Sequence, residues 1–85
     1  MDTTEAVRAM LDETGVSPYA AAMALGKTHS YISGMLRRGS EPAPSVLADI
    51  AHVCGRELVL VPEGSDVPES TIVIDGRLDW TADED

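Results

Sequence analysis

Residues 17–39 carry two short helical patterns separated by one glycine, and this arrangement constrains the fold more than any other feature of the chain. Ser17 followed by Pro18 predicts a helix start, because a hydroxyl can cap free N–H groups and proline at the first helical position loses no hydrogen bond. Small residues follow, and Gly26 ends the pattern. Thr28 predicts the N-cap of a second helix. The segment therefore predicts two short helices joined by a tight turn.

Four positions in this segment must carry particular side chains if the two helices are to cross closely. Ala22 is small enough to lie at the crossing, and Gly26 accepts the positive φ that the turn requires. Ile32 and Met35 then supply apolar side chains that fill the space between the helices. These residue types at this spacing predict a helix-turn-helix whose second helix spans residues 28–37.

Two further helices are expected around this pair. Asp2 and Glu5 form a capping-box pattern at the start of the first helix. The last helix is expected from Pro44 to Cys54, because apolar residues recur there at helical spacing. The predicted fold class is mainly α, with a compact four-helix helix-turn-helix domain over residues 1–55 and short β-strands in the C-terminal tail.

The tail pattern changes from helical to strand-like. The runs 57–61 and 71–74 have the composition and length of strands, and Asp75-Gly76 is typical of a hairpin turn leading into a last strand at 77–80. A lone strand leaves backbone groups unpaired, so the first run needs a partner within the chain or in a second copy. We expect residues 56–80 to be a dimerisation or partner-binding element. Residues 81–85 are expected to be a disordered acidic end.

Charge is distributed unevenly along the chain, whose formal net charge is -9. Residues 1–13 carry four acidic and one basic side chain, whereas residues 14–40 carry three basic and no acidic ones. Residues 41–85 carry eleven acidic and two basic side chains. The net charge alone argues against nucleic acid, but docking depends on the local field, and the acid-free window is locally positive.

Length and residue content exclude several classes of protein. The 85 residues allow one domain, and a single cysteine, Cys54, excludes an internal disulfide and a cysteine-based zinc site. His29 and His52 have no cysteine pair with which to build a metal site or a nucleophilic centre. We therefore expect no enzyme activity and neither a cofactor nor a metal. No apolar run is long enough to span a bilayer and no secretory signal begins the chain, so a cytoplasmic protein without a membrane partner is expected.

Residues 4–55 resemble the Cro/repressor-type helix-turn-helix family, the XRE-like regulators. The stretch SPYAAAMALGKTHSYISGMLRRG at residues 17–39 carries most of the resemblance, and PAPSVLADIAHVCG at residues 42–55 resembles the next helix of that family. The resemblance implies a helical bundle that binds double-stranded DNA by inserting the helix 28–37 into the major groove, usually as a homodimer on a near-palindromic operator.

Two positions depart from the family pattern. The first position of the second helix is often glutamine, which contacts phosphate and base, but here it is Pro18. The position after Ser33 often carries a base-reading side chain, but here it is Gly34. Two contacts that the family commonly makes are therefore missing, and base readout is expected to move to His29, Ser30 and Ser33.

The remaining candidate DNA contacts surround these three residues. Tyr31 is expected to pack on the DNA backbone or a thymine methyl group, or else to be a surface packing residue. Phosphate contacts are expected from Ser17, Lys27, Thr28, Arg37 and Arg38. For the two arginines, the alternative is a favourable interaction with the C-terminal end of their own helix.

The tail has a weaker resemblance to HipB-type antitoxins, which are DNA-binding dimers with strands after the helical domain. The shared features are a strand, a Pro-Glu-Ser loop at residues 68–70 and an acidic-Trp pair that ends at Trp80. Trp80 is either an anchor for a partner protein or a side chain that packs on its own hairpin.

Three functions follow from these patterns. The leading hypothesis is a sequence-specific transcriptional repressor that binds a near-palindromic operator as a dimer. The second is an antitoxin that neutralises a partner toxin through the acidic tail and represses its own operon. The third is a phage-encoded inhibitor or acidic nucleic-acid mimic on the same scaffold.

Overall fold

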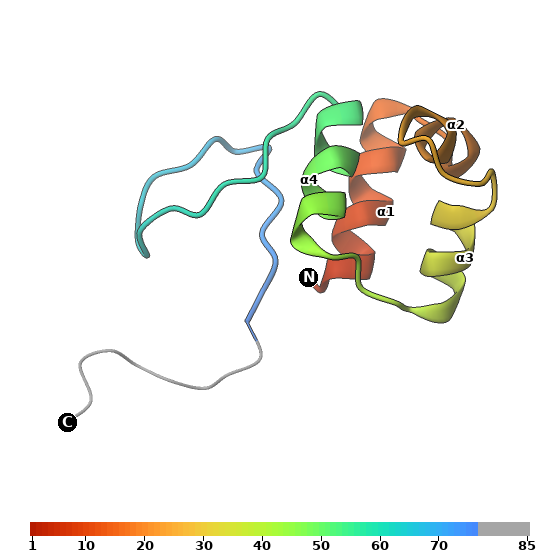
Figure 1. Cartoon of the computed structure of the whole chain (residues 1–85). Helices are drawn as coiled ribbons and strands as arrows, with labels where there is room; N and C mark the ends of the chain where they lie inside the picture. Colours follow the sequence, from red (N-terminus) through yellow and green to blue (C-terminus); the bar gives the residue numbers. More distant parts are fainter. Residues whose placement is uncertain (77–85) are drawn as a thin grey trace.

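The computed structural model of the chain describes residues 1–76, and this part is mainly helical (Figure 1). Its four helices are α1 (Thr3–Thr14), α2 (Pro18–Ala24), α3 (Tyr31–Arg38) and α4 (Pro44–Val53). α4 packs against α1 and α2, and α2 packs against α3. The predicted four-helix, mainly α architecture is confirmed. Among residues 1–76, no helix combines the length and apolar character that crossing a membrane requires.

Local capping interactions explain where the first two helices begin. The Asp2 carboxylate accepts the Glu5 N–H at 2.8 Å, and the Glu5 carboxylate accepts the Asp2 N–H at 2.9 Å. This is the predicted capping box. At α2, the Ser17 hydroxyl accepts the Ala20 N–H at 3.0 Å and Pro18 occupies the first turn, as the sequence predicts. These contacts satisfy N–H groups that no preceding helical turn can pair.

The core lies between the four helices and holds only apolar side chains. Ala21 and Ala22 on α2 have no exposed surface, so α3 crosses α2 closely there. Ile32 on α3 and Ile50 on α4 are also fully buried, and burying one such side chain stabilises the fold by about 1.5–3 kcal/mol. The full core cluster is Val7, Met10, Leu11, Ala21, Ala22, Ile32, Met35, Leu36, Leu47, Ile50, Ala51 and Cys54.

The predicted start of the second helix of the pair at Thr28 is wrong. α3 begins at Tyr31, and its N-cap is Ser30, whose side chain makes no capping hydrogen bond. Thr28 contributes its backbone carbonyl, which accepts the Tyr31 N–H at 3.0 Å and closes a tight turn. The Ser30 carbonyl then accepts the Gly34 N–H at 2.8 Å, the spacing of a regular α-helix. His29 and Ser30 therefore precede α3.

The predicted strands of the tail are not formed in the part of the chain that the structure describes. Residues 57–61 and 71–74 have irregular backbone. The hairpin turn at Asp75-Gly76 is also absent, because the two-residue turn types need a positive φ at Asp75 and no described non-glycine residue has one. Strands depend on paired neighbours, and residues 77–80, the predicted partner of the second run, lie outside the described residues.

Polar contacts hold the tail against the helices at its two ends. At the start, the Arg56 guanidinium forms an ion pair with Glu13 of α1 and donates to the Ser70 carbonyl at 3.2 Å. At the other end, the Met1 amino group contacts the Asp75 carboxylate at 2.5 Å, and the Asp75 N–H donates to the Met1 carbonyl at 3.0 Å. The hydrogen bond to Asp75 raises the pKa of the Met1 amino group above its ordinary value.

Candidate nucleic-acid interface

α3 divides into an inward apolar face and an outward polar face. Ile32, Met35 and Leu36 are buried in the core. Ser33, Arg37 and Arg38 are exposed, and so is the turn of residues 27–30 that precedes the helix. The packing that buries the apolar face thus presents the candidate DNA contacts to solvent together. Tyr31 is half-buried and packs against the core, so only part of its ring is available.

Two residues of the turn before α3 make contacts with aromatic rings. The Lys27 ammonium lies 5.4 Å from the centre of the Tyr31 ring, a cation–π geometry that leaves its N–H donors free. The His29 ring lies 6.0 Å from the ring of Tyr19, and the two planes are tilted by 37°. Tyr19 projects from α2 and is 60% exposed. Tyr19 could not be singled out from the sequence, because nothing in a linear pattern shows that the first turn of α2 adjoins the turn before α3.

Ser17 has a second use besides capping α2. Its oxygen accepts the Ala20 N–H, so its own hydroxyl proton is available as a donor. A phosphate oxygen is a suitable acceptor for that proton. Capping and phosphate contact are therefore compatible at this one side chain.

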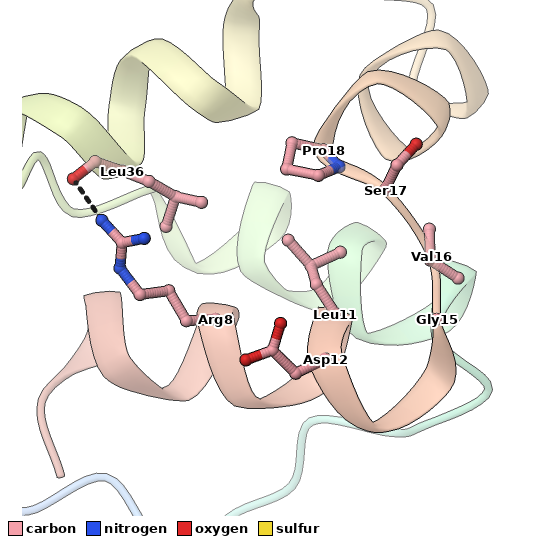
Figure 2. Close-up of a pocket in the computed structure, with 8 residues that line it drawn as sticks. All are labelled: Arg8, Leu11, Asp12, Gly15, Val16, Ser17, Pro18 and Leu36. Carbon is pink, nitrogen blue, oxygen red and sulfur yellow. Dashed lines mark hydrogen bonds between the residues drawn. The ribbon is translucent and has the colours of Figure 1, made fainter.

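A side chain of α1 also contacts the end of α3, and no local sequence pattern predicts this contact. Arg8 of α1 donates from Nη2 to the carbonyl of Leu36 near the end of α3, at 3.3 Å (Figure 2). The two residues border a cavity of about 330 Å³ between α1, the start of α2 and the end of α3. The Leu36 carbonyl is one of the last in α3, and it also accepts the Gly39 N–H at 3.2 Å. Arg8 thus links α1 to the C-terminal end of α3.

The electrostatics of the outward face are uniformly positive. Lys27, Arg37 and Arg38 are the charged residues between positions 14 and 40, and all three are exposed. The side chains of Arg37 and Arg38 make no ion pair or hydrogen bond within residues 1–76. An exposed arginine with all of its donors free can bind a phosphate or a base edge at no cost in broken contacts.

The part of the chain that holds these helices matches a known protein family. A family model described as Helix-turn-helix matches residues 7–61, which is well over half of the chain. The chain belongs to the helix-turn-helix family. The match supports a DNA-binding transcription regulator of the XRE type, a regulatory rather than an enzymatic family. Comparisons of this helix-turn-helix protein with curated proteins and with solved structures gave no significant match.

The match covers the whole helix-turn-helix and ends within the tail. Gly26, with φ of 71°, and the buried Ala22, Ile32 and Met35 take the conformations and the burial that the motif requires. Trp80 lies beyond the matched range and outside the described residues. The comparison therefore bears on the DNA-binding part of the helix-turn-helix protein and leaves the resemblance of the tail to HipB-type antitoxins as a prediction.

Proposed function

We propose that the protein is a repressor that binds a near-palindromic operator as a dimer, with α3 of each subunit in the major groove. The observation that carries the proposal is the exposed face of α3 and its preceding turn, where three cations lie without any carboxylate partner among the described residues. Phosphate binding requires such unpaired cations, and the groove admits one α-helix. The motif supports the same placement.

The roles of individual residues follow from their positions. His29 and Ser30 precede the first turn of α3, and Ser33 is exposed on it, so these three face base edges. Lys27 and Arg37 flank the helix and neutralise phosphates. Further donors to the DNA backbone are the hydroxyl groups of Ser17, Tyr19, Thr28 and Tyr31.

Selection of bound duplexes from a random pool, followed by gel shift on the selected sequence, tests this proposal. The expected result is one enriched near-palindromic sequence and a salt-sensitive complex. Arg37→Ala should weaken that complex about tenfold or less, because one phosphate contact is lost. Arg77→Ala removes the same charge from outside the motif and should leave the affinity nearly unchanged. Absence of any enriched sequence, or an unaltered activity of Arg37→Ala, would instead favour the inhibitor or mimic function.

The tail supports the dimeric part of the proposal. The backbone of residues 57–61 makes no hydrogen bond within the described residues. Its apolar side chains are exposed, with Val59 at 62% and Leu60 at 100%. An apolar segment with an unpaired backbone is a template for pairing with another strand. We propose that residues 57–61 of two copies pair about a two-fold axis and form the strands that the sequence predicts.

Sedimentation equilibrium tests the pairing of the tails. The full chain should sediment as a dimer, and Leu60→Asp should sediment as a monomer, because it places a charge in an apolar interface. Val73→Asp is the matched control, since Val73 is also an exposed aliphatic residue of the tail but lies outside the pairing segment. Dimers of equal stability in all three proteins would contradict the proposed pairing. Binding of a toxin through Trp80 stays a prediction.

A further inference from the structure

Gly34 is a glycine in the middle of α3 that the helix backbone does not require. Its φ is not in the left-handed region, so alanine could adopt the same backbone. Glycine inside a helix destabilises it relative to alanine. Gly34 is nevertheless buried, although it has no side chain of its own. Another group must therefore cover it.

That group is the guanidinium of Arg38. A Cβ atom added to Gly34 would lie 2.9 Å from Arg38 Nη1 and 3.8 Å from Arg38 Cζ. The guanidinium therefore rests directly on the backbone of α3. Residues 34 and 38 are four apart, and helical side chains point toward the N-terminus, so Arg38 lies back over the preceding turn. The same Cβ would lie 3.9 Å from Arg37 Nη2.

We propose that the missing side chain at Gly34 lets the Arg38 guanidinium rest on the backbone of α3, and that Arg38 recognises a guanine from this position. We call this position the seat of Arg38. This inference rests on the proposed function, since it names the side chain that supplies base specificity. The guanidinium of the exposed Arg38 lies back over Gly34, toward the part of α3 where Ser33 is exposed. Its donors are unused within residues 1–76. Two of them match the N7 and O6 acceptors of guanine.

The neighbouring charge strengthens the assignment. Arg37 brings a second guanidinium near the same glycine, and two unpaired cations repel one another. An acceptor-rich base edge or phosphate relieves this repulsion. We assign Arg37 to a flanking phosphate and Arg38 to the base, because Arg38 is the one held against the helix backbone.

Three variants in the duplex selection test the seat. The wild type should enrich guanine at one position of each half-site, and Arg38→Ala should lose that preference, with a drop of about 10- to 100-fold in discrimination against the other bases. Gly34→Ala should lose part of it while the protein stays folded, because a methyl group displaces only the flexible end of Arg38. Arg37→Ala should lower the affinity for all sequences and keep the guanine preference.

The outcomes separate this inference from the proposed function. If the wild type enriches a sequence but Arg38→Ala keeps the same base preference and binds all duplexes more weakly, Arg38 is a phosphate contact and the inference is overturned. If Gly34→Ala behaves like the wild type, Arg38 needs no seat and the inference is likewise overturned. If the wild type enriches no sequence, the proposed function itself fails. Circular dichroism of each variant confirms that its helices are retained.

Discussion

Gly26 and Gly34 are glycines for different physical reasons, although they lie only eight residues apart. Gly26 has φ of 71°, in the left-handed region that side chains other than glycine rarely adopt. A Cβ at Gly26 would meet nothing within 4 Å, so its constraint is purely conformational. Gly34 has ordinary backbone but a Cβ there would collide with Arg38. The first glycine serves the fold, and the second shapes the surface of α3.

This difference predicts opposite effects of one substitution. Gly26→Ala should lower the free energy of unfolding by about 1–2 kcal/mol, because an L-residue in the left-handed region is strained. Gly34→Ala should raise it by up to about 1 kcal/mol, because alanine favours the helix. Urea unfolding followed by circular dichroism measures both values. Equal changes in the two variants would show that the turn at Gly26 does not demand a positive φ.

At the scale of the elements, the helices were predictable where their signals are local. The Asp2–Glu5 capping box and the Ser17 cap are each made within four residues, so the sequence alone is sufficient. The start of α3 was not predictable in this way, because both Thr28 and Ser30 are suitable caps and the tight turn selects the second. The tail strands are not formed within residues 1–76, and they cannot be judged from a local pattern, because strand pairing depends on partners far along the chain or in another copy.

The candidate site likewise combines features that a local sequence pattern predicts with features that depend on distant residues. The exposure of Arg37 and Arg38 follows from helical periodicity, and it could be predicted. The contact of Arg8 with Leu36 spans 28 residues and could not, because no local pattern links a side chain on α1 to a carbonyl at the end of α3. In the sequence, Arg8 is simply one base among four acids.

The contact between α1 and α3 predicts a role for Arg8 in holding α3, the proposed DNA-binding helix. Arg8→Met keeps the aliphatic stem but removes the donor, so the Leu36 carbonyl loses one of its two partners. We expect the free energy of unfolding to fall by about 0.5–1.5 kcal/mol. Affinity for the selected duplex should fall as well, because the end of α3 is less firmly placed. Thermal unfolding and gel shift measure the two effects.

Arg8→Lys provides the control for charge. Lysine keeps the positive charge but lacks the planar guanidinium, so it should recover the electrostatic part of any loss in DNA affinity. If Arg8→Met and Arg8→Lys lose the same affinity and stability, the hydrogen bond to Leu36 is the important feature. If neither variant differs from the wild type, α3 is held by its apolar packing alone.

At the scale of the whole molecule, positive and negative charge are segregated. Lys27, Arg37 and Arg38 lie on α3 and its preceding turn and have no carboxylate partner within residues 1–76, whereas the tail carries several exposed carboxylates. In Figure 1 the tail extends from the α1 and α4 side, away from α3. Such a separation attracts DNA to one face and repels it from the other. The net charge of -9 therefore limits where DNA can bind, and does not exclude binding.

The small number of cations sets the salt dependence of binding. Two or three phosphate contacts per subunit would give about four to six in the proposed dimer, and each contributes about -0.9 to the slope of log K against log salt. The expected slope is therefore between about -3.5 and -5.5. Gel shifts at about 50 to 200 mM salt measure it. A slope near zero would contradict a phosphate footprint, and one steeper than about -8 would require cations that the face of α3 does not hold.

The acidic tail predicts low affinity for non-specific DNA. Neutralising three exposed carboxylates with Glu63→Gln, Asp66→Asn and Glu69→Gln should increase binding to random duplexes severalfold at low salt, because a repulsive field is removed. The effect should fade near physiological ionic strength, where charges more than about 8 Å apart are screened. The control variant Glu63→Asp, Asp66→Glu and Glu69→Asp keeps every charge. It should change neither the affinity for random duplexes nor the affinity for the selected duplex. If neutralisation leaves non-specific binding unaltered at low salt, the tail carboxylates serve another partner and not the selection of one DNA-binding face.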